Sequence, residues 1–185
     1  MNVKTIYCAV CVCVSLLLPF TACAEDKRPN VFFGDKENQI RLTVGQSLSS
    51  GVEDLYTTSL IYSQPGTFFR LPSRNNLEIG GFKGKKASDP NTDLSQYNLT
   101  YLGLSKDVQL FHIDNFYVAL GLGGYIKSER THRISSKFTF GQTATLGYNA
   151  DPFVIEIHAR HFSNGSLTDK NAGQSFYGLA IGSNF

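Results

Sequence analysis

The chain has 185 residues, with 17 Lys and Arg residues against 15 Asp and Glu residues and a formal net charge of +2. A charge so close to balance does not predict a nucleic-acid partner. All four cysteines lie within the first 23 residues, at Cys8, Cys11, Cys13 and Cys23, so the chain beyond them has no disulfide and no thiolate chemistry.

The first residues have the pattern of an export signal. A short basic stretch, Met1–Lys4, precedes an apolar run, Thr5–Phe20, and Ala22-Cys23-Ala24 matches a small-x-small cleavage site. We therefore predict a cleaved signal peptide over residues 1–24 and a single folded domain over residues 25–185. The alternative is a lipoprotein signal that ends at Cys23, but Phe20 fits a lipobox poorly.

After the signal, apolar and polar residues alternate along the chain, which predicts β-strands rather than helices. Stretches rich in Gly, Pro, Asn and Asp divide this pattern into about eight segments. They are residues 38–48, 55–64, 76–84, 95–106, 115–126, 137–149, 152–163 and 174–185. Most are close to the roughly 9 to 11 residues that a tilted strand needs to cross a bilayer. No run of about 18 apolar residues follows the signal, so we expect no membrane-spanning helix.

The alternation gives each segment an apolar face and a polar face. In the seventh segment the apolar face has Phe153, Ile155, Ile157 and Ala159, and the polar face has Glu156, His158 and Arg160. The first, sixth and eighth segments show the same alternation. An apolar exterior around a polar lumen is typical of a membrane barrel. We therefore expect the charged residues to pack inside through ion pairs and hydrogen bonds.

The predicted fold class is all-β, an eight-stranded antiparallel transmembrane β-barrel of the bacterial outer membrane. The terminal Phe185, preceded by alternating hydrophobic residues, supports this prediction because it is a familiar signature of such barrels. The alternative is a periplasmic or secreted β-sandwich or lipocalin-like barrel, whose apolar faces would form one interior core.

Topology predicts which end of the barrel carries each connection. With both termini in the periplasm and short periplasmic turns, the connection between the seventh and eighth segments lies outside the cell, near lipopolysaccharide. Basic residues flank two other exterior connections, namely Lys85, Lys86, Arg130 and Arg133. We expect these residues to pair with phosphates of an anionic glycolipid. The alternative is that they only keep the loops soluble.

His161 and Ser163 continue the outward face of the seventh segment. Because they are two residues apart on a strand, they share one face, where an imidazole can activate a hydroxyl. A lone His-x-Ser arises by chance, but here it lies in His161-Phe162-Ser163-Asn164-Gly165, followed by Asn171-x-Gly173. This motif resembles that of the lipid A 3-O-deacylase (PagL) family, in which a histidine, a serine two residues on and an acidic residue on the next strand form a triad.

The resemblance extends over most of the chain after the signal and includes Gly121-Leu122-Gly123-Gly124 and Ser135-Ser136-Lys137-Phe138. It implies an outer-membrane barrel that removes the ester-linked acyl chain at the 3 position of lipid A, with no metal or organic cofactor. The implied partners are lipid A or lipopolysaccharide and the lipids of the outer membrane. A homodimer is compatible with the apolar exterior that we expect.

Carried over by position, the resemblance assigns three roles near the end of the seventh segment. Ser163 is the nucleophile that attacks the ester, His161 is its general base, and Asn164 is the donor of the oxyanion hole. In the second half of the reaction, water hydrolyses the acyl-enzyme.

The third position of the triad falls on Ser175, where the family has an acidic residue. A hydroxyl can fix the imidazole tautomer, but it cannot stabilise an imidazolium as a carboxylate does. We therefore expect a slow or catalytically weakened enzyme. Asp169 is a substitute only if its loop folds back over the pair, and Glu156 points into the barrel by strand parity.

The competing function is that of a non-catalytic small barrel of the OmpX or adhesin type, whose exterior loops bind partners. Long projecting loops would favour that function, whereas the connections predicted here, of about 5 to 12 residues, favour the enzyme. An acyltransferase barrel stays open as a third function, because only the acceptor that replaces water would differ.

Overall fold

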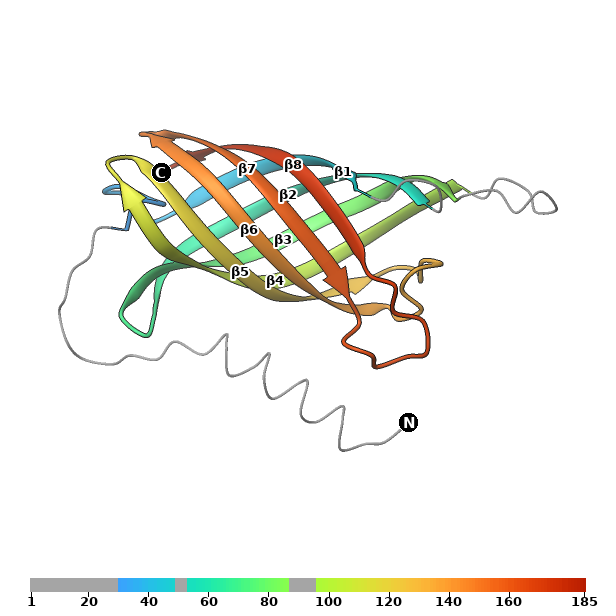
Figure 1. Ribbon diagram of the computed structural model, residues 1–185. Helices are drawn as coiled ribbons and strands as arrows, with labels where there is room; N and C mark the ends of the chain where they lie inside the picture. Colours follow the sequence, from blue (N-terminus) through green and yellow to red (C-terminus); the bar gives the residue numbers. More distant parts are fainter. Residues whose placement is uncertain (1–29, 49–52, 87–95) are drawn as a thin grey trace.

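Eight antiparallel strands close into a barrel in the computed structural model of the protein, which describes residues 30–48, 53–86 and 96–185 (Figure 1). The strands are β1 (Gln39–Ser47), β2 (Glu53–Phe68), β3 (Leu71–Lys86), β4 (Gln96–Ile113), β5 (Phe116–Lys127), β6 (Phe138–Ala150), β7 (Phe153–Ser163) and β8 (Gln174–Asn184). Each strand pairs with its neighbours in the chain, and β8 pairs with β1. The predicted fold class is confirmed. The predicted signal peptide, residues 1–24, lies outside the described residues.

The β2–β3 hairpin is longer than the sequence analysis predicts. The predicted segments 55–64 and 76–84 lie inside strands of 16 residues each. Pairing continues through Pro65 and Gly66, beyond the predicted end of the segment at residue 64. The turn consists of Phe69 and Arg70, both with positive φ, as a two-residue turn between right-twisted strands requires. Strand β4 likewise extends beyond its predicted end, to Ile113.

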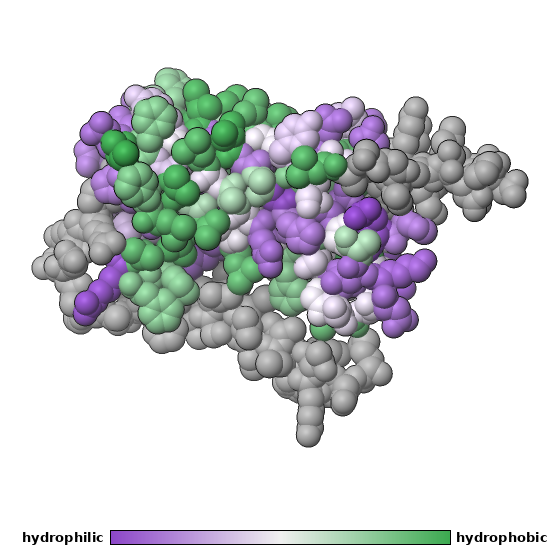
Figure 2. All heavy atoms as spheres, in the orientation of Figure 1, coloured by the Kyte–Doolittle hydropathy of each residue, from purple (hydrophilic) through white to green (hydrophobic). Residues whose placement is uncertain are grey.

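The two faces of the barrel wall differ as the alternation predicts. Large apolar side chains are exposed on the outside, as for Leu42, Ile79 and Ile155. Figure 2 shows hydrophobic residues gathered over the wall, with hydrophilic residues toward the end that carries the longer connections. Glu156, next to Ile155, is only 2% exposed. The sandwich and lipocalin-like alternatives, which need an apolar interior, are therefore wrong. Among the residues that the structure describes, no helix is long and apolar enough to cross a bilayer.

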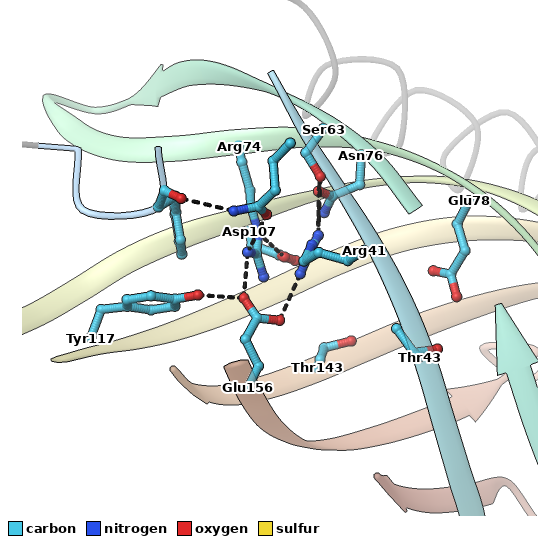
Figure 3. Close-up of polar contacts among 12 residues, drawn as sticks. Arg41, Thr43, Ser63, Arg74, Asn76, Glu78, Asp107, Tyr117, Thr143 and Glu156 are labelled. Carbon is cyan, nitrogen blue, oxygen red and sulfur yellow. Dashed lines mark hydrogen bonds and ion pairs between the residues drawn. The ribbon is translucent and has the colours of Figure 1, made fainter. Parts of the chain in front are cut away.

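Ion pairs fill the middle of the lumen (Figure 3). The Glu156 carboxylate on β7 accepts hydrogen bonds from Arg41 of β1 and Arg74 of β3, and also from the Tyr117 hydroxyl of β5. Arg74 pairs in addition with Asp107 of β4 at 2.8 Å. Charges tolerate such burial because each one has a partner of opposite sign. The network thus fixes which face of five strands points inward.

An aromatic cluster fills the lumen nearer the longer connections. The Phe162 ring of β7 lies 5.1 Å from that of Tyr125, and the Phe176 ring of β8 stacks on Phe82 at 4.9 Å. Phe162 and Phe176 are 2% and 1% exposed. Because neighbouring residues on a strand point to opposite faces, this cluster anchors the stretch of wall whose outer face carries His161.

At the opposite end, residues 31–33 fold into the mouth of the lumen. The Phe32 ring meets the Tyr117 ring edge-on at 4.9 Å, and the Phe33 side chain is buried as well. The backbone of Val31 is held by the side chains of Gln109 and Asn149. Side chains therefore occupy the interior at both ends and in the middle.

We predict that Glu156→Gln lowers the free energy of unfolding by about 3 to 5 kcal/mol, because two buried guanidinium groups lose the charge that compensates them. Urea unfolding of the barrel in lipid vesicles measures this change. Glu129→Gln, on the exposed β5–β6 connection, is the control and should unfold like the wild type. Equal unfolding midpoints for all three proteins would show that the network contributes little to stability.

Candidate active site

A row of three polar side chains crosses the outer wall near the end of the barrel that carries the longer connections. In the strand register, His161 of β7 stands opposite Ser175 of β8 on one side and opposite Gln142 of β6 on the other. The next outward positions along β7 and β8 toward the middle of the wall are Ala159 and Tyr177, which are both exposed. The row is thus a polar patch in the apolar wall, because the outward positions beyond it on β6 and β5 include Phe140, Phe138 and Ile126.

The imidazole of His161 is joined to the residue at the third triad position. Its Nδ1 lies 2.8 Å from the Ser175 hydroxyl. When Nδ1 carries the proton it donates to this hydroxyl, and Nε2 then has a lone pair for a second partner. The two acidic residues considered as substitutes lie elsewhere. Glu156 is paired inside the lumen, and Asp169 is exposed on the β7–β8 connection.

The opposite edge of the imidazole lies against the backbone of Gly173. A Cβ placed on Gly173 would stand 2.5 Å from Cε1 and 2.8 Å from Nε2 of His161, and the residue has a φ of +66°. The register that pairs His161 with Ser175 puts Gly173 opposite Ser163 if it is continued by one step. The Nε2 edge of the ring is therefore turned toward the level of Ser163.

Ser163 lies two residues beyond His161 on the same face and is half-buried. Its hydroxyl makes no hydrogen bond with any residue of the described segments 30–48, 53–86 and 96–185. The pair thus shares one face of β7, with an imidazole that is held on one side and a hydroxyl that is free to bond with a ligand.

Asn164 shapes the β7–β8 connection, residues 164–173. It is fully buried, and its amide donates to the Thr168 hydroxyl at 2.6 Å and to the Lys170 carbonyl at 3.0 Å. Its Oδ1 accepts from the backbone N–H of Ser166, and its own N–H donates to the Asn171 side chain. Both amide hydrogens are used within the connection, so this conformation offers neither to a substrate as an oxyanion donor.

The basic residues predicted to bind phosphate lie in different environments. Arg133 is half-buried and donates to the carbonyl groups of Gly173 and Ala172. Arg130 is exposed on the same β5–β6 connection. Lys85 and Lys86 end β3, but their side chains lie outside the described part of the structure. The described contacts therefore give Arg133 a role in holding the backbone.

An open groove on the outer wall leads away from His161 and Ser175 along the apolar surface. A hollow of about 470 Å³ is lined by Gln142, His161 and Ser175, and a second one of about 900 Å³ follows it along the wall. The two hollows share Ala144 and Ala159, which stand opposite each other on β6 and β7. Small side chains thus form the floor where the two hollows meet.

Sequence reasoning missed Gln142 and the alanine floor because both depend on the register between β6 and β7. The signal that fixes this register is the turn Asp151-Pro152, between strands that end at Ala150 and begin at Phe153. Counting back from a two-residue turn would have put Gln142 opposite His161. The contacts of Gly173 and Arg133, in contrast, have no signal in the sequence.

We predict that Gly173→Ala displaces the imidazole of His161 while the barrel still folds. A methyl group there would overlap the ring, so the ¹⁵N resonances of the His161 side chain should shift. Gly34→Ala is the matched control, because its φ is +59° but a Cβ there would lie 3.8 Å from its nearest neighbour. The two variants therefore share backbone strain. An unshifted His161 signal in Gly173→Ala would contradict the packing described here.

Comparison with known proteins identifies a family that the sequence matches. The sequence matches the family model described as lipid A 3-O-deacylase (PagL) over residues 51–184. No curated protein sequence matches the chain. The solved structure of the outer-membrane enzyme PagL is similar with a TM-score of 0.57 and 16% identity, over 80% of this chain and 99% of that one. The outer-membrane protein Ail of Yersinia pestis is similar with a TM-score of 0.51 and 16% identity, over the same shares of the two chains.

At this level of identity the two solved structures show the fold alone, which is that of small outer-membrane barrels. The family match covers strands β2 to β8 but not β1. It includes the His161–Ser163 pair and the residues that surround it. The chain belongs to the lipid A 3-O-deacylase (PagL) family, a family of hydrolases that act on lipid A.

Proposed function

We propose that this protein is a serine esterase of the outer membrane that hydrolyses the ester-linked acyl chain at the 3 position of lipid A. The observation that carries the proposal is the hydrogen bond between His161 Nδ1 and the Ser175 hydroxyl at 2.8 Å, on the same outer face as Ser163. It orients the imidazole as the third member of a triad does. Family membership supplies the substrate class.

In the proposed reaction, Ser163 Oγ attacks the ester carbonyl while its proton passes to His161 Nε2. Collapse of the tetrahedral intermediate breaks the bond to the sugar oxygen, which takes the proton from Nε2. Water then attacks the acyl-enzyme by the same route, and the fatty acid leaves as Ser163 regains its proton. Asn164 serves as the oxyanion donor in this scheme only if one of its amide hydrogens leaves Thr168 or Lys170 when the substrate binds.

The position of the pair on the wall fits an ester of lipid A. That ester lies where the sugar headgroup meets the hydrocarbon, and His161 and Ser175 lie near the end of the barrel that carries the longer connections, which we propose to face the headgroups. The groove over Ala144 and Ala159 runs from the pair into the apolar region. It offers the acyl chain a place along the wall, where the contact would come from van der Waals packing because the chain is already out of water.

The outer leaflet is the side that we propose for the site. Turns of two residues join β2 to β3, β4 to β5 and β6 to β7, and the longer connections, including residues 164–173, lie at the other end (Figure 1). Outer-membrane barrels have short periplasmic turns and longer extracellular loops. This orientation places His161 and Ser163 beside lipopolysaccharide.

We predict that a bacterium that expresses the wild type loses one 3-hydroxyacyl chain from its lipid A, as measured by mass spectrometry. Ser163→Ala and His161→Ala should lower the rate by at least about 10³-fold, because in other serine hydrolases the nucleophile and base act as a unit. Ser183→Ala, near the far end of β8, should act like the wild type. Unchanged lipid A with a folded wild-type barrel would refute the esterase.

We predict that Ser175→Glu raises kcat at least about tenfold, because loss of the orienting carboxylate costs on the order of 10⁴ in rate in well-studied serine hydrolases. Ser175→Ala should lower kcat, since the imidazole loses the hydroxyl of β8 that holds its Nδ1. Steady-state kinetics in detergent micelles measure both effects. Ser183→Glu puts the same charge on the same outward face of β8 and should leave kcat unchanged. A fall in kcat for Ser175→Glu would show that the hydroxyl serves a different purpose.

A further inference from the structure

The β5–β6 connection, residues 128–137, is hydrogen-bonded to the β7–β8 connection beside the candidate active site. Arg133 Nε donates to the Gly173 carbonyl at 2.6 Å, and Nη2 donates to the Ala172 carbonyl at 3.0 Å. The Arg133 carbonyl in turn accepts from the Ala172 N–H at 2.9 Å. A planar guanidinium that donates two bonds to successive carbonyl groups fixes their orientation as a lysine cannot.

Gly173, which these hydrogen bonds hold, is also in contact with the imidazole of His161. The backbone of Gly173 packs against the Cε1–Nε2 edge of His161, so closely that a Cβ there would overlap the ring. The Ser175 hydroxyl holds the other side of the ring at Nδ1. The imidazole is therefore confined between a hydrogen bond from β8 and a glycine backbone whose carbonyl Arg133 holds.

We propose that Arg133 is a positioning residue of the esterase, which aims His161 at Ser163 by holding Gly173. This inference rests on the proposed function. At the third triad position this chain has a neutral hydroxyl, which orients the ring more weakly than a charge-assisted hydrogen bond from a carboxylate. Packing against a fixed backbone supplies orientation from the other side.

Binding of a substrate phosphate, the role that the sequence suggests for Arg133, fits the structure less well. Two guanidinium nitrogens are already committed to backbone carbonyl groups, and the side chain is half-buried rather than extended into solvent. A phosphate contact and a positioning role make opposite predictions for a substrate that has no phosphate.

Other contacts keep the two connections together when Arg133 is replaced. Ile134 forms a β-bridge with Asn171. The Ser135 hydroxyl lies 2.7 Å from that of Thr168, and the Ser135 N–H donates to the Lys170 carbonyl at 3.1 Å. A variant of Arg133 therefore loosens Gly173 without separating the two connections.

Kinetics with two substrates test the proposal. Arg133→Gln should lower kcat by about 10-fold to 100-fold, the order expected when a catalytic group is misplaced by about 1 Å. The loss should be equal for phosphorylated lipid A and for a neutral p-nitrophenyl acyl ester, with little change in KM. Arg133→Lys should restore only part of kcat. Arg70→Gln, in the exposed β2–β3 turn, removes the same charge at the far end of the barrel and should match the wild type.

A spectroscopic measurement separates this inference from the proposed function. The ¹⁵N side-chain resonances of His161, identified by their loss in His161→Ala, should shift or broaden in Arg133→Gln. If the wild type hydrolyses neither ester, the proposed function fails and this measurement alone decides the positioning role. Unchanged His161 resonances, wild-type kcat in an active enzyme, or a loss confined to the phosphorylated substrate would each overturn the proposal.

Discussion

Strand parity is the constraint on which the rest of this structure depends. A strand in a closed barrel sends alternate side chains to the lumen and to the outer wall, and a slip of one residue would exchange the two sets. In β7 the lumen side is fixed by Glu156, whose carboxylate is held by two arginines, and by Phe162 in the aromatic cluster. His161 and Ser163 consequently face outward. The ion pairs inside the barrel therefore decide which side chains the outer wall presents.

The sequence was most informative where a side chain has only two directions to choose from. Alternation alone predicted the eight strands and their faces, and it put Ser175 on the same wall as His161, where the structure finds the two in contact. Alternation could not predict the strand register or the contacts made by the connections. The length of the β2–β3 hairpin depends on pairing that overrides Pro65 and Gly66. The contacts of Asn164 depend on the fold of its own connection, and those of Arg133 depend on two connections that meet only in space.

The candidate site has a neutral hydroxyl, Ser175, where the resemblance of its motif implies a carboxylate. A carboxylate would both orient the ring and stabilise its charged form. The Ser175 hydroxyl and the Gly173 backbone provide only orientation. The similarity to Ail shows that this fold carries more than one kind of outer-membrane protein, so the activity has to be argued from these residues and not from the barrel.

The filled interior has a consequence for the cell that makes such a protein. Phe32 and Phe33 close one mouth, ion pairs cross the middle, and aromatic rings pack the other end. A barrel whose lumen is filled with side chains in this way does not form an open channel across the bilayer. It can present a reactive surface to the surrounding lipids while ions and small toxic solutes still meet an intact permeability barrier. The proposed esterase would therefore let the cell remodel its outermost lipid from within the membrane plane without making that membrane leak.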